Sequence, residues 1–181
     1  MNGIINVYKE RGFTSHDVVA KLRGILHMKK IGHTGTLDPD ATGVLPVCIG
    51  KATKVCGLLT DKDKTYRAVV KLGVTTNTED MTGEILAKHP VSVTKEQIEM
   101  AVSKFAGEIE QIPPMYSAIK INGKKLYELA RQGKEVERKA RKVTIYEIKV
   151  LSIDFSENEF TMEVSCSKGT YIRTLCKDIG E

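Results

Sequence analysis

The sequence lacks any hydrophobic stretch approaching the roughly 18 apolar residues that a membrane-spanning helix requires. Its first nine residues, MNGIINVYK, also lack the basic-then-apolar pattern of a signal peptide, and they alternate as a strand does. These two absences argue against a membrane protein and a secreted one. We therefore expect a cytoplasmic protein.

Closely spaced metal ligands are also missing. The four cysteines stand at positions 48, 56, 166 and 176, none of them in a C-x-x-C pair, and no histidine cluster accompanies them. Because a structural zinc site needs such paired ligands, the sequence predicts no metal. Reduced, buried thiols are the expected state of these cysteines.

Three nucleotide or ion motifs fail on inspection. In the segment Gly43–Lys51 the two glycines stand further apart than a phosphate-binding loop requires, and Ala52 replaces its Mg²⁺-binding hydroxyl. The segment Asp38–Gly43 begins like a calcium loop, but Ile49 occupies the position of the bidentate glutamate. No G-x-G-x-x-G follows a strand. A nucleotide-hydrolysing enzyme is therefore a distant alternative, and a dinucleotide site is unsupported.

The composition is that of a globular domain. The chain has 181 residues, 41% hydrophobic and 28% charged, which is enough for one sizeable core. The net charge of +5 is mild, but basic residues concentrate in one stretch. They are Lys120, Lys124, Lys125, Arg131, Lys134, Arg138, Lys139, Arg141 and Lys142. This stretch is either a solvated helix-and-turn surface or a surface that contacts phosphates.

The hydrophobic pattern mixes strands and helices without strict βαβ alternation. Ser15 is the expected N-cap of the first helix, and Thr94–Gln97 is a capping box that opens a later one. Expected strands span residues 3–9, 44–49, 64–72, 116–121, 143–155 and 159–167, and further helices 52–59, 126–132 and 169 to the end. This order predicts an α+β fold with a mixed, largely antiparallel central sheet flanked by helices, forming one domain over residues 1–181.

One loop concentrates residues of special conformation around a single carboxylate. Gly32, Gly35 and Gly43 surround Asp38, and Pro39 fixes the turn that follows it. Such a loop holds Asp38 in a defined place, as a reacting carboxylate requires. Taken singly, Asp38 has the simpler interpretation of a helix-cap or Asx-turn residue. By the same standard, Tyr66 would be a core aromatic and Arg173 a surface arginine.

Four sequence motifs, which follow one another in a fixed order, favour the functional interpretation of these residues. The motifs are GHTGTLDPxATGxLP (32–46), KTYRA (64–68) followed by LG, PPxYSAxK (113–120) and SKGTYIRTL (167–175). Together they resemble the TruB family of tRNA pseudouridine synthases, and the resemblance covers the whole chain. The loop over residues 75–83 resembles the bacterial stand-alone enzymes more than the synthases that use guide RNA. The Arg-Leu-Asp context of another synthase branch is absent.

The resemblance implies a pseudouridine synthase catalytic fold and an isomerase, a tRNA pseudouridine(55) synthase, that flips out and isomerises the T-loop uridine without a cofactor. It implies that Asp38 is the catalytic carboxylate, as a nucleophile at C1′ or a base at C2′, and that Arg173 is its ion-pair partner. Tyr66 is implied to stack on the flipped base and to act as general base. The rival hypothesis is an RNA-binding module or an RNA-folding chaperone without turnover.

The resemblance further implies that His33 fills the space left by the flipped base and that Tyr171 packs in the uridine pocket. Lys120, Lys124, Lys125 and Lys134 are candidate contacts to the tRNA T-arm. We expect a monomer with no obligatory protein partner. The resemblance implies that family members continue beyond Asp178-Ile179-Gly180 and carry a C-terminal RNA-binding domain, so we expect an incomplete catalytic domain here.

Overall fold

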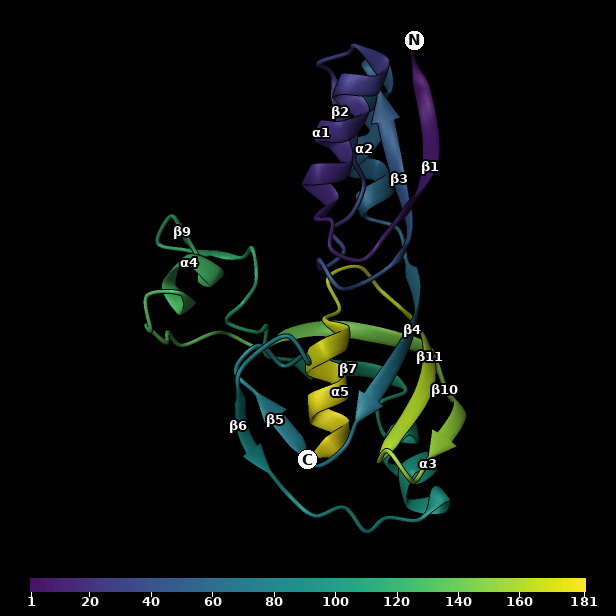
Figure 1. The fold of residues 1–181 in the computed structure, drawn as a ribbon, viewed down its shortest axis with the longest axis vertical. Coiled ribbons are helices and arrows are strands. Elements are labelled where there is room, and N and C mark those ends of the chain that lie inside the picture. Colours follow the sequence, from purple (N-terminus) through teal and green to yellow (C-terminus); the bar gives the residue numbers. More distant parts are fainter. The chain divides into compact units, whose positions relative to one another are not determined.

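The computed structural model describes residues 1–181, and they form two compact units, Met1–Lys62 and Asp63–Glu181 (Figure 1). Each unit has strands and a hydrophobic core of its own. A single catalytic domain over residues 1–181 remains a prediction. No helix in the chain is both long enough and apolar enough to cross a membrane.

The first unit is a three-stranded antiparallel sheet with helices. Its elements are β1 (Gly3–Lys9), α1 (Ser15–Leu26), β2 (Ile31–His33), β3 (Gly43–Ile49), the 3-10 helix η1 (Gly50–Val55) and α2 (Cys56–Thr60), with strand order β1-β3-β2. Val18 and Val19 of α1 are buried in one cluster with Leu45 and Val47 of β3. This apolar contact places α1 against one face of the sheet.

The N-terminus of α1 corrects one prediction. The N-cap is Thr14, whose hydroxyl accepts from Asp17 N while the Asp17 carboxylate accepts from Thr14 N. Ser15, the expected N-cap, is instead the first helical residue and is buried. Its hydroxyl accepts a hydrogen bond from Leu37 N at 3.0 Å, because it faces the Asp38 loop rather than the end of its own helix.

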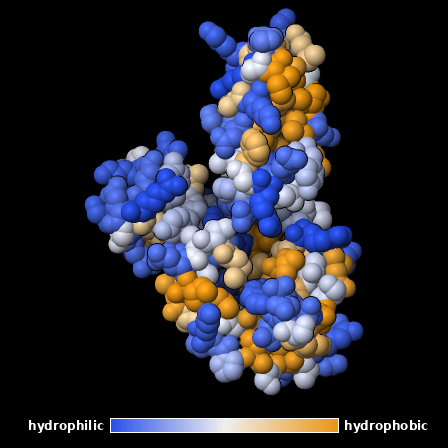
Figure 2. Space-filling view, viewed as in Figure 1, coloured by the Kyte–Doolittle hydropathy of each residue, from blue (hydrophilic) through white to orange (hydrophobic).

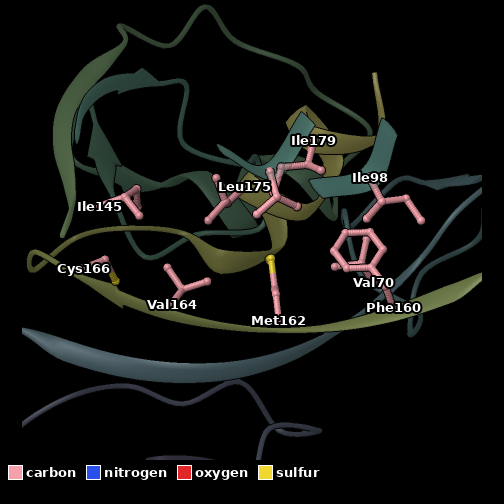
Figure 3. Close-up of a cluster of buried hydrophobic side chains, with 10 residues drawn as sticks. Val70, Ile98, Ile145, Phe160, Met162, Val164, Cys166, Leu175 and Ile179 are labelled. Carbon is pink, nitrogen blue, oxygen red and sulfur yellow. The ribbon is translucent and has the colours of Figure 1, made fainter. Parts of the chain in front are cut away.

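The second unit is built on a four-stranded antiparallel sheet in the order β4-β11-β10-β7. The strands are β4 (Lys64–Lys71), β7 (Gly107–Gln111), β10 (Arg141–Asp154) and β11 (Glu159–Cys166), packed with α3 (Lys95–Ser103) and α5 (Ile172–Gly180). Figure 3 shows Met162 and Val164 of β11 close to Leu175 of α5, with Phe160 and Val70 beside Ile98 of α3. The long hairpin predicted over residues 143–167 is confirmed.

Short elements complete this unit: β5 (Val74–Thr76), β6 (Ile85–Lys88), β8 (Lys120–Ile121), β9 (Lys124–Lys125) and α4 (Leu126–Ala130). The strand predicted over residues 116–121 was wrong for most of its length, because residues 116–118 form bends. The predicted 75–83 loop begins within β5. Five strands were not predicted, since each is short or lacks a strong apolar alternation: β2, β5, β6, β7 and β9. The α+β, antiparallel fold class is confirmed.

Candidate active site

The Asp38 loop connects β2 and β3 and is fixed by its backbone. Leu37 N donates to the Ser15 hydroxyl, Ala41 N donates to Asp38 O at 3.0 Å, and Gly12 N donates to Pro39 O at 2.9 Å. Each residue beside Asp38 is thus tied to α1 or to the turn before it. The Asp38 side chain is exposed, so the loop presents a carboxylate from a fixed backbone.

A fully buried lysine lies under this loop. Lys9 is 0% exposed, and its ammonium donates to Phe13 O at 2.6 Å, Glu10 O at 3.1 Å and Pro39 O at 3.1 Å. Burial lowers the pKa of Lys9, and the nearby charges of Asp38 and Asp40 oppose that shift. Lys9 was not predicted from the sequence as a residue of this site. The sequence nevertheless indicates that Lys9 points toward the core. The alternation of residues 3–9 places position 9 on the same face as Val7, which packs against the core.

His33 ends β2, where it pairs with Val47 of β3. Its side chain is half-buried, and Nδ1 lies 2.6 Å from Gly35 O. This contact within the loop orients the imidazole ring. His33 and Asp38 therefore both belong to the first unit, His33 at the end of β2 and Asp38 in the loop that follows it.

Arg173 lies in the first turn of α5, in the second unit. Its guanidinium donates through Nη2 to Tyr116 O at 2.7 Å and through Nη1 to Thr78 O at 3.5 Å. Nη1 also forms an ion pair with Asp80 Oδ2 at 3.4 Å. The side chains of Arg173 and Asp80 are 13% and 28% exposed, so this pair is largely shielded from water. Asp38, the expected partner, belongs to the other unit, and that pairing stays a prediction.

Asp80 is held by its own loop as well. Its Oδ1 accepts from Thr78 Oγ1 at 2.8 Å, from Thr82 Oγ1 at 2.6 Å and from Thr82 N at 2.9 Å. Burial acts to raise the pKa of Asp80, but these hydrogen bonds and the Arg173 charge together hold it below its ordinary value. Asp80 was not predicted from the sequence, because the threonine-rich segment around it indicates no more than a loop.

Tyr66 and Tyr171 both lie in the second unit and are both half-buried. Tyr66 is on β4, opposite Val164 of β11, and packs against the core. Tyr171 immediately precedes α5, and its backbone forms two hydrogen bonds with the buried Gln111 side chain: Tyr171 N donates to Oε1 at 2.8 Å, and Nε2 donates to Tyr171 O at 3.0 Å. Gln111 thereby fixes the start of the helix that carries Arg173.

The predicted RNA-contacting lysines lie on a protruding segment that contains β8, β9 and α4 (Figure 1). Lys120, Lys124 and Lys125 surround the Asn122-Gly123 turn, where both residues have positive φ, and Lys134 follows α4. Lys125 donates to the Tyr127 hydroxyl at 3.2 Å, whereas the side chains of Lys120, Lys124 and Lys134 are exposed. Figure 2 shows that hydrophilic residues dominate the visible surface of this segment.

All four cysteines are free thiols. Burial raises the pKa of Cys48 to about 11 and that of Cys176 to about 12. No three or more His, Cys, Asp or Glu side chains are grouped as metal ligands.

The sequence of this chain matches that of a known protein family. The sequence model of the TruB family pseudouridylate synthase (N-terminal domain) matches residues 23–172, a range that contains His33, Asp38, Tyr66 and Tyr171. Proteins named tRNA pseudouridine synthase B from Alkaliphilus oremlandii and Lachnoclostridium phytofermentans are 62% and 65% identical to this chain over 181 and 187 residues. Each match covers 100% of this chain but only 60% or 61% of the relative.

Solved structures agree with this assignment. A chain in the structure described as a Cbf5-Nop10-Gar1 complex is 35% identical, with a TM-score of 0.75 over 98% of this chain and 43% of its own length. An H/ACA RNP bound to a substrate RNA containing 2'-deoxyuridine contains another match, 32% identical with a TM-score of 0.71. The chain spans about 60% of the length of its curated relatives. It belongs to the TruB family of pseudouridylate synthases.

Proposed function

We propose that this chain is the catalytic part of a tRNA pseudouridine synthase that isomerises the T-loop uridine of tRNA. The observation that carries the proposal is the 62% identity, over the full chain, to a protein named tRNA pseudouridine synthase B. The base leaves its sugar nitrogen, rotates and rejoins through carbon. A base inside a folded loop has to be flipped out before such chemistry.

Asp38 is the reacting carboxylate in this proposal. It is an exposed acid on a loop whose backbone is held by Ser15, Gly12 and Lys9, and such fixing favours a defined approach to the sugar. Attack at C1′ and proton removal at C2′ both require its ionised form. Arg173 would stabilise that charge, and Asp80 and Tyr116 O hold its guanidinium in place.

Aromatic side chains would hold the flipped base and the gap it leaves. Tyr66 would stack on the uracil and take the C5 proton, Tyr171 would pack beside it, and His33 would occupy the vacated place in the RNA stack. Stacking of this kind is worth on the order of 1–3 kcal/mol per base. The half-buried position of all three rings leaves part of each available for contact.

Recognition of the T-arm would depend on shape and backbone charge. The exposed lysines of the protruding segment are suited to phosphate contacts, and Arg138 ties the base of that segment through a 3.2 Å hydrogen bond to Pro113 O. We further propose a monomer that acts without a protein partner, in the cytoplasm, where tRNA is modified.

The test is single-turnover release of tritium from C5-labelled uridine in a T-arm stem-loop. We expect release by the parent chain, none by Asp38→Asn, and equal RNA affinity in both. The matched control is Asp40→Asn, which makes the same chemical change two residues away on the exposed part of the same loop and should retain release. RNA binding by the parent without release would instead favour an RNA-binding module.

A further inference from the structure

The first unit contains a cavity of about 550 Å³ that the proposed chemistry does not use. Its wall is formed by α1, by the segment from Lys29 through β2, and by η1 with the start of α2. His16 and Arg23 line it from α1, and Cys56 lines it from the start of α2. His33, at the end of β2, belongs to the same wall, so the cavity adjoins the Asp38 loop.

The charge of this cavity is of one sign. Arg23, Lys29 and Lys30 line it together with the imidazoles of His16 and His33, and no aspartate or glutamate does. Arg23 donates through Nη2 to Ile31 O at 3.3 Å, which fixes the guanidinium beside β2. The side chains of Lys29 and Lys30 are exposed. Three permanent cations around one concave surface produce a positive potential that attracts an anion.

We propose that this cavity binds a backbone phosphate of the RNA, adjacent to the nucleotide that His33 contacts. The inference rests on the proposed function, because it takes its ligand from the same RNA. Arg23 and the two lysines would donate to the phosphate oxygens, and the cavity is large enough to accept the attached ribose as well.

The chemistry favours a phosphodiester in RNA over a free phosphate or nucleotide. Lysines on an open surface contribute mainly by releasing counterions from a polyanion, an effect that a small free anion lacks. His33 belongs both to the cavity wall and to the RNA-contacting loop. Contact between His33 and the RNA would therefore already place the neighbouring nucleotide beside the cations.

The test compares Lys29→Ala/Lys30→Ala with Lys51→Ala/Lys54→Ala, which removes the same charge from exposed positions of the same unit outside the cavity. Affinity for a T-arm stem-loop is measured over a range of salt concentrations. We expect the double variant Lys29→Ala/Lys30→Ala, the cavity pair, to weaken binding about 10-fold. The salt slope, which is the change of log affinity with log salt concentration, should fall in magnitude by roughly 0.7–0.9 per lost contact. The control pair should change affinity less than about twofold.

A second measurement identifies the phosphate. Single methylphosphonate substitutions along the stem-loop should include one that weakens binding to the parent but not to Lys29→Ala/Lys30→Ala, as expected for a contact removed from either side. Equal losses in the cavity and control pairs, or the absence of such a position, would overturn the inference. Saturable binding of uridine monophosphate or inorganic phosphate, abolished by the cavity pair while RNA affinity is unchanged, would also overturn it in favour of a small-anion site.

Failure of this inference is distinguishable from failure of the proposed function. If the parent releases tritium but the cavity pair behaves like the control pair, only the cavity assignment is lost. If the cavity pair alone changes the salt slope but the parent releases no tritium, only the catalytic proposal is lost.

Discussion

Nη1 of Arg173 lies 3.4 Å from Oδ2 of Asp80, so the arginine assigned to catalysis already has an acidic partner within its own unit. Tyr116 O accepts from the other terminal nitrogen at 2.7 Å. A guanidinium held at both ends is oriented before substrate arrives, which lowers the cost of orienting it during the reaction.

Arg173→Ala should abolish tritium release while retaining RNA affinity, because the guanidinium is largely shielded and acts on the reacting carboxylate in our proposal. We expect a loss of at least about 100-fold in the single-turnover rate, as for removal of one preorganised donor. Rate and dissociation constant are measured on the same stem-loop. Equal losses in both would show that Arg173 serves binding or folding instead.

Asp80 should make the free energy of unfolding depend on pH. Its folded pKa is below the unfolded value near 3.8, so its stabilising contribution is complete above that value and is lost as pH falls through the folded pKa. Asp80→Asn should therefore destabilise the protein at neutral pH and differ less from the parent in acid. Urea unfolding at both pH values measures this. A destabilisation that stays constant with pH would contradict the assignment.

Lys9→Met should destabilise the first unit, since Phe13 O and Pro39 O would lose a donor in a buried place. Each buried acceptor left unsatisfied costs about 1–3 kcal/mol. The lowered pKa of Lys9 adds a second signature. The unfolded state binds more protons between the folded pKa and 10.5, so the parent gains stability with rising pH in that window and Lys9→Met should lose this slope.

Urea unfolding followed as a function of alkaline pH measures both effects. Lys54→Met is the control, because Lys54 is exposed and its replacement should change stability by no more than about 0.5 kcal/mol. Equal behaviour of the two variants would show that the Lys9 ammonium does not hold the Asp38 loop.

Replacing Lys124, Lys125 and Lys134 with alanine should weaken T-arm binding and flatten its salt dependence, because these residues lie on the protruding hydrophilic segment. Lys125 should contribute least, since its ammonium already interacts with the Tyr127 hydroxyl and lies 5.3 Å from the ring centroid. Single variants measured over a salt series separate the three. An unchanged salt slope in the triple variant would place the phosphate contacts elsewhere.

Much of this molecule could be predicted from the sequence alone. Local signals were sufficient for β1, for the capping box at Thr94 and for the long hairpin, because alternation and capping act between residues that are close in the chain. The density of glycine and proline around Asp38 likewise singled out the loop. The ordered motifs indicated the family before any fold was known.

Tertiary structure alone decided which groups hold these residues in place. Ser15 accepts a hydrogen bond from Leu37 N instead of capping its own helix, and the buried Lys9 donates to Pro39 O. Asp80 pairs with Arg173, which lies 93 residues away in the chain. No local pattern encodes such pairs, because a hydrogen bond between distant residues depends on how the elements pack. The sequence predicted which residues react, and packing determined how their backbones and charges are positioned.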